Sequence, residues 1–218
     1  MAKQKKIKEE KETKIDQQIK KYLPFLAWLG VLVLLFIVLS FVFQSLGKVK
    51  YEGLVFTKEK YGEVLIYHYS YLTKVSNGNV RAINVLLRTN PAENNVPIDG
   101  EIIYPENKAV YLSINSTGLN CTYSMVAISE LTNFIANNDL SIKIGNPDKS
   151  YAEKNNQTYV TCEKYPSNMV ISIKTGEETI IRKTGDFCYN VEVADCKILP
   201  ALEKFIVQSI IDAKNSED

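Results

Sequence analysis

Four cysteines are the residues with the clearest chemistry in this chain of 218 residues. Cys121, Cys162, Cys188 and Cys196 all follow a long apolar segment. An even number of cysteines confined to one side of such a segment predicts disulfide bonds in an oxidising compartment. The chain has no Cys-x-x-Cys pair and no histidine near these positions. We therefore expect neither a zinc site nor a thiol oxidoreductase.

The pairing of the cysteines is open, because four cysteines allow three connectivities. We favour Cys188 with Cys196, which would tie a strand to the start of the last helix. Cys121 with Cys162 would then tie the start of the middle helix to a strand. The alternative is buried free thiols in a reducing compartment.

Three Asn-x-Ser/Thr sequons also follow the apolar segment, and they are acceptors for N-glycosylation on the outer side of a membrane. We predict Asn156, in a polar loop, as the best site and Asn115 as a second. Asn120 is disfavoured, because a bridged Cys121 beside it would hinder access. Sequons of this kind also arise by chance in an asparagine-rich chain.

The only histidine, His68, lies within the strand-like sequence YHYSY. A catalytic histidine is conceivable, but no G-x-S-x-G accompanies it, so we favour a structural or solvent role. Tyr67, Tyr69 and Tyr71 alternate onto one face of this strand. They could form a carbohydrate- or peptide-binding platform, but we favour packing under a helix or beside the membrane surface.

Acidic residues flank a proline-rich loop at Asp99, Glu101 and Glu106. Paired carboxylates could hold calcium or hydrolyse glycosides, but the spacing fits no EF-hand, and we favour solvated acids. The chain contains no Walker A, G-x-G-x-x-G or H-E-x-x-H motif. We therefore predict no catalytic residue, no cofactor and no metal.

The apolar segment from Phe25 to Phe43 is 19 residues long and carries no charge. As a helix it would reach about 28 Å, close to the thickness of a bilayer's hydrocarbon core. We predict a transmembrane signal-anchor helix over residues 22–46. The lipid bilayer is then one partner of the chain.

Residues 1–21 carry eight lysines and four acidic residues. This excess of lysine predicts a cytoplasmic tail by the positive-inside rule, with a domain over residues 47–218 outside the cell, as in a single-pass type II membrane protein. Two alternatives remain, a cleaved signal peptide and a pilin-like leader. The apolar region is longer than is typical of a cleaved signal peptide. The charged–apolar junction lacks the small residue at which a pilin-like leader ends.

The outer domain has strand patterns and two helical patterns. An Asn-Gly pair at 77–78 predicts a hairpin between strands 64–73 and 80–89. The remaining strands are expected at 51–57, 110–115, 140–144, 158–162, 169–175, 179–183 and 187–193. Apolar residues at helical spacing predict helices over 124–136, with Ser124 as N-cap, and over about 197–213. The fold class is mixed α/β (α+β), with one mostly antiparallel sheet and two packed helices.

The formal net charge of +1 gives no support for nucleic-acid binding. A resemblance to other proteins is carried by three stretches: YEGLVFTKEKYGEVLIYHY at 51–69, NNVPIDGEI at 94–102 and YVTCEKYPSNMVI at 159–171. The chain resembles uncharacterised archaeal single-span membrane proteins that have a lysine-rich tail and a small cysteine-containing outer domain. The resemblance implies location and host, and it carries over no activity or functional residue.

We expect a membrane-anchored outer module that binds an envelope protein or glycan, or assembles into the envelope. The alternatives are an envelope enzyme built from dispersed residues and a minor pilin-like subunit. A deep pocket with converging polar groups favours an enzyme. An exposed apolar patch or an open sheet edge favours a binding module.

Overall fold

The structure is a computed structural model that describes residues 24–25, 27–39, 47–75, 78–106, 108–115 and 119–216. The chain divides into two units, Met1–Gly47 and Lys48–Asp218. In the first unit, residues 27–39 form a helix with exposed side chains. No helix within the described ranges has the length and apolar character needed to cross a bilayer. The predicted tail and parts of the predicted span, including residues 40–46, lie outside these ranges.

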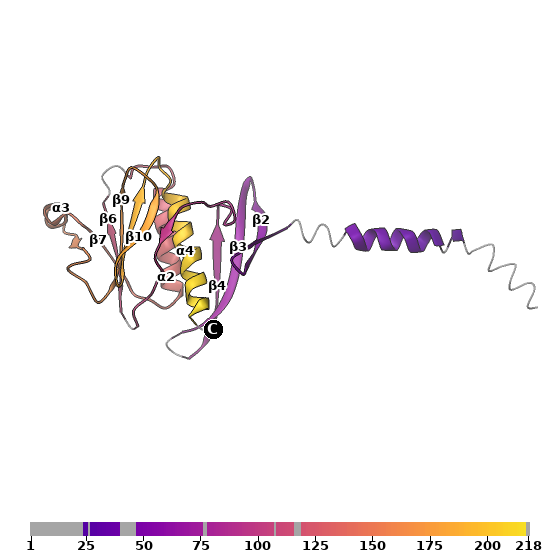
Figure 1. The fold of residues 1–218 in the computed structure, drawn as a ribbon, viewed down its shortest axis with the longest axis horizontal. Helices are drawn as coiled ribbons and strands as arrows, with labels where there is room; N and C mark the ends of the chain where they lie inside the picture. Colours follow the sequence, from indigo (N-terminus) through magenta and orange to yellow (C-terminus); the bar gives the residue numbers. More distant parts are fainter. Residues whose placement is uncertain are drawn as a thin grey trace, which may run out of the picture. The chain divides into compact units, whose positions relative to one another are not determined.

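The second unit consists of two β-sheets with two helices between them (Figure 1). The first sheet is antiparallel, with the strand order β1-β2-β3-β4. Its strands are β1 (Lys48–Tyr51), β2 (Leu54–Tyr61), β3 (Val64–Lys74) and β4 (Val80–Leu87). Alternate residues of each strand face the helices, which gives this sheet one buried and one exposed face.

The second sheet has the order β5-β10-β11-β9-β6-β7-β8, and only its β10–β11 pair is antiparallel. Its strands are β5 (Ile98–Asp99), β6 (Val110–Ile114), β7 (Ile142–Asn146), β8 (Thr158–Tyr159), β9 (Met169–Thr175), β10 (Ile180–Gly185) and β11 (Cys188–Val193). The mixed α+β class and an antiparallel sheet are confirmed. The prediction of one mostly antiparallel sheet is wrong. There are two sheets, and in the second one α2 forms the crossover between the parallel strands β6 and β7, while residues 147–157 join the parallel strands β7 and β8.

Tight turns at three glycines define the first sheet. Glu52 and Gly53 both have positive φ, at 44° and 75°, so a two-residue turn joins β1 to β2. This turn divides the predicted strand 51–57. Gly62 has φ of 62° in the turn from β2 to β3. The β3–β4 hairpin predicted from Asn77-Gly78 is confirmed, with Gly78 at φ 83°.

The two predicted helices are present as α2 (Ser124–Asn137) and α4 (Ile198–Asn215), and they pack against each other between the sheets. Ser124 is inside α2 and does not cap it; its hydroxyl donates to the carbonyl of Leu119. A short helix, α3 (Lys149–Lys154), occupies the predicted polar loop, capped by the Asp148 side chain, which accepts from Tyr151 N–H at 3.0 Å.

Buried carboxylates on α4 hold the chain segment that passes from the first sheet to the second. Glu203 accepts hydrogen bonds from the backbone N–H groups of Arg88 and Thr89. Asp212 accepts from the backbone N–H of Ile102 at 2.8 Å. These bonds compensate for burial of the two acids, because unpaired buried carboxylates are costly. They also fix the path of residues 88–104 along α4.

The segment that follows β8 covers the outer face of the second sheet. Val160 packs there with Tyr111 and Val170, and the ring of Tyr165 stacks on Tyr111 with centroids 3.9 Å apart. Gly145 of β7 permits this close approach, because a Cβ there would lie 2.1 Å from the carbonyl oxygen of Thr158. A larger residue at this position would push the segment away from the sheet.

All four cysteines form disulfides, as predicted, but the favoured pairing is wrong. Cys121 pairs with Cys196, with Cα atoms 5.5 Å apart, and Cys162 pairs with Cys188, at 5.7 Å. The first bond joins the segments that lead into α2 and α4, which lie side by side. The second fastens the segment after β8 to β11 across the outer face of the sheet. Both pairings depend on the parallel arrangement of the second sheet.

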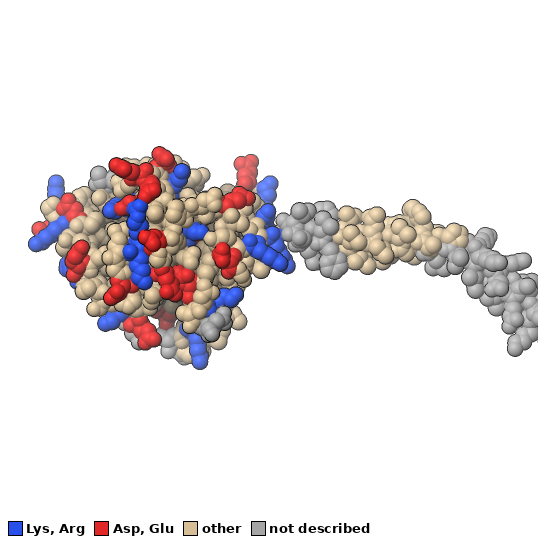
Figure 2. All heavy atoms as spheres, viewed as in Figure 1, with Lys and Arg blue, Asp and Glu red and all other residues tan. Residues whose placement is uncertain are grey.

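Charged side chains of both signs are interspersed on the face of this unit seen in Figure 2. On β9, β10 and β11, Glu192 pairs with Lys174 at 3.0 Å and with Arg182 at 2.8 Å. Exposed pairs of this kind contribute little stability individually. Stability must come mainly from the two buried faces and the disulfides.

We predict that serine at both Cys121 and Cys196 lowers the free energy of unfolding by roughly 4.5 kcal/mol, because the bond closes a loop with a separation of 75 residues. For Cys162 and Cys188, with a separation of 26, the expected loss is roughly 3.5 kcal/mol. Urea unfolding of the intact protein measures both changes. Peptide mapping without reductant is the control, and a linked Cys188–Cys196 fragment would contradict this connectivity.

Candidate functional site

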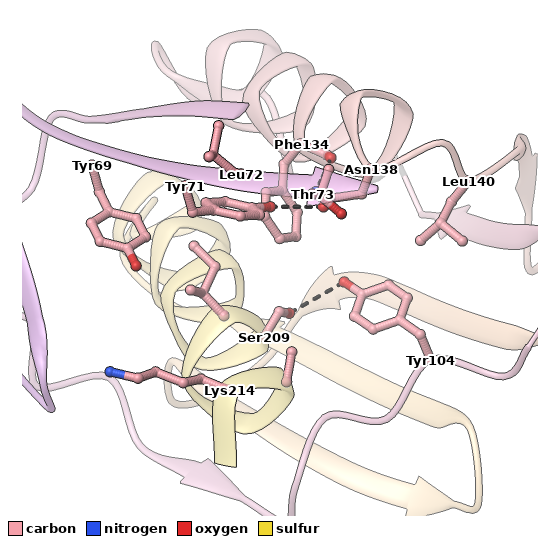
Figure 3. A pocket seen from close by; sticks show the side chains of 12 residues that line it. Tyr69, Tyr71, Leu72, Thr73, Tyr104, Phe134, Asn138, Leu140, Ser209 and Lys214 are labelled. Carbon is pink, nitrogen blue, oxygen red and sulfur yellow. Dashed lines mark hydrogen bonds between the residues drawn. The ribbon is translucent and has the colours of Figure 1, made fainter. Parts of the chain in front are cut away.

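A cavity of about 360 Å³ opens between β3, the last turns of α2 and α4, and the segment around Tyr104. Figure 3 shows aromatic side chains from three directions around it. Tyr69 and Tyr71 come from β3, Phe134 from α2 and Tyr104 from the crossing segment. The volume is in the range of small-molecule sites, and the lining is mainly aromatic and aliphatic, as is usual for such sites.

The strand register of β3 determines which tyrosines reach the cavity. Tyr67, Tyr69 and Tyr71 lie opposite Leu87, Val85 and Ile83, on the sheet face toward the helices. Tyr67 is buried in the core, while Tyr69 and Tyr71 line the cavity with their rings 5.9 Å apart. The prediction that this face packs under a helix is confirmed, and the same face also forms one wall of the cavity.

Two tyrosine hydroxyls in the cavity are held by hydrogen bonds. Tyr71 donates to Asn138 Oδ1 at 2.8 Å, and the Asn138 amide donates to the Phe134 carbonyl. Tyr104 lies 3.2 Å from Ser209 Oγ. Because the Ser209 hydroxyl donates to the Phe205 carbonyl, Tyr104 must be the donor to Ser209. Each phenol oxygen therefore keeps a lone pair for a donor group on a ligand.

Burial raises the pKa of Tyr104 and of Tyr71, so both phenols stay neutral at physiological pH. Tyr69 and Lys214 lie on one side of the cavity, opposite Tyr104 and Leu140 (Figure 3). Among the described residues, neither the Tyr69 hydroxyl nor the Lys214 ammonium has a hydrogen-bond partner. Lys214 is also the single charged residue of the lining. This side of the cavity can therefore accept an anionic or polar group.

His68 lies on the opposite, exposed face of the first sheet. Its Nδ1 is 2.7 Å from Glu59 Oε1 and its Nε2 is 3.0 Å from Asn84 Oδ1. The bond to Glu59, followed by the bond to Asn84, raises the pKa of His68. A carboxylate orients this imidazole, as in catalytic triads, but its second nitrogen meets an amide instead of a hydroxyl or thiol. The arrangement is a polar network across three strands.

Asp99, Glu101 and Glu106 are all exposed. The contact recorded for Glu101 is through its backbone carbonyl, which accepts from the Tyr189 hydroxyl at 3.0 Å. Within the described ranges, no group of three His, Cys, Asp or Glu side chains is placed to hold a metal ion.

The two predicted glycosylation sites differ in accessibility. Asn156 and the other residues of its sequon are exposed, in the turn after α3. Asn115 is half-buried, and its backbone N–H donates to Ile173 at 3.0 Å. Residues 116–118, which complete its sequon, lie outside the described ranges. The geometry therefore favours Asn156 as the acceptor.

Glu130 of α2 was not anticipated from the sequence. Its side chain is only 23% exposed, and its Oε1 lies 3.6 Å from Arg88 Nε. Its Oε2 is buried with no hydrogen-bond partner. Burial, followed by the nearby carboxylate of Glu203, raises the pKa of Glu130 from 4.5 to about 7, and Arg88 opposes the shift. The sequence held only a weak signal for these two carboxylates. Glu130 directly precedes the buried Leu131 on α2, and Glu203 directly follows the buried Leu202 on α4.

Comparison of the chain with protein-family models, with curated proteins and with solved structures finds no match. A functional assignment therefore depends on the geometry of the cavity and of the exposed surfaces.

Glu130 should make stability depend on pH. A raised pKa means that the folded state binds this proton more tightly than the unfolded chain does. Its stabilising effect is complete below pH 4.5 and is lost as the pH rises to about 7. We predict that E130Q flattens the fall in unfolding free energy between pH 5 and pH 8 by about 1–3 kcal/mol.

Urea unfolding at both pH values measures this effect. E153Q is the matched control, because Glu153 is 68% exposed. Equal pH slopes in wild type and E130Q would contradict the shift.

Proposed function

We propose that this protein is a membrane-anchored extracytoplasmic binding module that holds a small amphipathic ligand in the tyrosine-lined cavity. The observation that carries the proposal is the cavity itself. Tyr69, Tyr71, Tyr104 and Phe134 wall it, and Lys214 lies at one side with no partner among the described residues. A ligand with an apolar or aromatic body and one anionic group matches these contacts.

Its chemistry fits binding better than catalysis. The phenols of Tyr71 and Tyr104 are neutral and already hydrogen-bonded, so they can orient a ligand but are poor general bases. His68 faces the other side of the sheet, away from the cavity. The alternative of an envelope enzyme would need reactive groups to converge on the ligand, and the cavity lining supplies none except Lys214.

The outer face of the first sheet supports a second role, in binding an envelope protein or glycan. Large apolar residues are exposed there, with Leu72 at 73% and Val80 at 65%. Val55 and Leu86 share this face. An exposed apolar surface of this kind is typical of interaction sites.

The proposed location outside the membrane is supported by the disulfides and by the sequence pattern. Paired cysteines are typical of oxidising compartments. The apolar run at 25–43 and the lysine-rich residues 1–21 favour an uncleaved anchor with the domain outside. The exposed Asn156 sequon is consistent with that side of the membrane.

Binding in the cavity is tested with trifluoromethylbenzoate, an aromatic carboxylate, by fluorine NMR on the full chain in nanodiscs of zwitterionic lipid. We predict that L140W abolishes binding, because the indole fills the cavity. We predict that K214A weakens binding several-fold, because it removes the cation that faces the carboxylate.

Two controls make this test specific. The neutral trifluoromethylbenzamide should bind wild type and K214A equally, and K154A, which changes an exposed lysine on α3, should leave benzoate binding unchanged. Benzoate binding that L140W does not alter would refute the cavity as the site.

Mass spectrometry of the intact protein from its native membrane tests the location. We predict a chain that retains residues 1–21, carries two disulfides and loses a glycan mass in N156Q. Free thiols with an unmodified Asn156 would contradict the outer placement, and loss of residues 1–21 would favour a pilin-like subunit.

A further inference from the structure

Strand β4 is an open edge of the first sheet. It pairs with β3 on one side, and on its other side no strand pairs with it among the described residues. Natural sheets protect such edges with lysine, proline or a covering segment. The opposite edge, β1, is short and carries Lys48 and Lys50. By contrast, β4 has eight residues, no proline and a single charge, Arg81, near its start.

A groove of about 300 Å³ runs along this edge between β4 and α2. On the helix side, Glu130, Asn133 and Asn137 have the spacing i, i+3, i+7, which places them on one face of α2. Phe134 and Ile206 supply apolar lining from the helices, in addition to the apolar residues of β4 itself. The groove therefore offers backbone hydrogen-bonding groups on one wall and a row of polar side chains on the other.

The groove also contains an unsatisfied acceptor. Glu130 Oε2 is buried without a hydrogen-bond partner, and the distance of 3.6 Å from Arg88 to Oε1 is longer than a hydrogen bond. A buried acceptor without a donor is unfavourable. A cationic donor that enters the groove would satisfy this oxygen and would favour the ionised form of Glu130, whose charge is complementary to lysine or arginine.

We propose that β4 and α2 accept an extended segment of another protein, which adds to the first sheet as a fifth strand and places a lysine or arginine against Glu130. The dimensions are compatible. Two positions along a strand span about 6.7 Å, which lies between the axial distances from Glu130 to Asn133 and to Asn137, about 4.5 Å and 10.5 Å. A basic residue at Glu130 and a polar side chain two positions away would therefore both face the helix, the second one between the two asparagines.

This surface differs from the tyrosine-lined cavity, with which it shares only Phe134. The proposal does not depend on a ligand in that cavity. A second copy of this chain, paired edge to edge through β4, is the competing occupant, and the test separates it.

The test uses the full chain in nanodiscs and a fluorescent octapeptide of alternating threonine and valine with one central lysine. The first control peptide has glutamate in place of lysine, and the second has N-methylated backbone amides that cannot pair with a strand edge. We expect both controls to bind about tenfold or more weakly than the lysine peptide. Hydrogen exchange should slow at residues 80–87 when the lysine peptide binds, and not at 48–51.

On the protein side, E130Q should weaken the lysine peptide about tenfold, while E153Q should not. Binding of trifluoromethylbenzoate in E130Q should remain unchanged, which keeps failure here distinct from failure of the cavity. Equal binding of the N-methylated peptide, or protection at β1, would overturn the proposal. If residues 80–87 become protected from hydrogen exchange as the protein concentration rises, without any peptide, the proposal would also be overturned, because a second copy of this chain would then occupy the edge.

Discussion

The burial of helix α4 between two sheets is the interaction on which the domain depends. Its buried residues point toward both sheets, and the Phe205 ring meets Tyr189 of β11 edge-on at 5.7 Å. In the described part of the chain, α2 is the other helix of this layer, and it buries five residues against twelve for α4. Loss of packing on one face of α4 would therefore expose the core of both sheets, which makes the three layers one cooperative unit.

The same helix positions the candidate site. Glu203 and Asp212 fix the crossing segment by its backbone N–H groups, and Ser209 receives the hydroxyl of Tyr104 from that segment. Tyr104 consequently lies across the cavity from Tyr69. Two acids within a buried helix are costly in isolation, but here they determine where a surface segment runs. The contacts that fix the crossing segment and the contact that holds Tyr104 are thus all made by one helix.

Local features of this fold could be predicted from sequence, and long-range ones could not. The Asn-Gly turn identified the β3–β4 hairpin, and helical periodicity identified α2 and α4. The parallel second sheet was missed, because its strands are short and a strand's own pattern does not reveal its neighbour. Wrong disulfide partners followed from that error, since Cys162 meets Cys188 of β11 only where the segment after β8 crosses the outer face of the second sheet. The alternation of Tyr69 and Tyr71 indicated a shared face, but the cavity beside it depends on where α2 and α4 end.

The position of α4 in the chain has a consequence for how the protein is made. Chains are synthesised from the N-terminus, and α4, the larger of the two helices in the central layer, follows the strands of both sheets in the sequence. Both sheets therefore emerge before α4 is available to cover its share of their apolar faces. If the domain is exported, it would cross the membrane before its core can close, a state suited to a translocation channel. The synthesis of α4, rather than of either sheet, sets the earliest moment at which this domain can close its core.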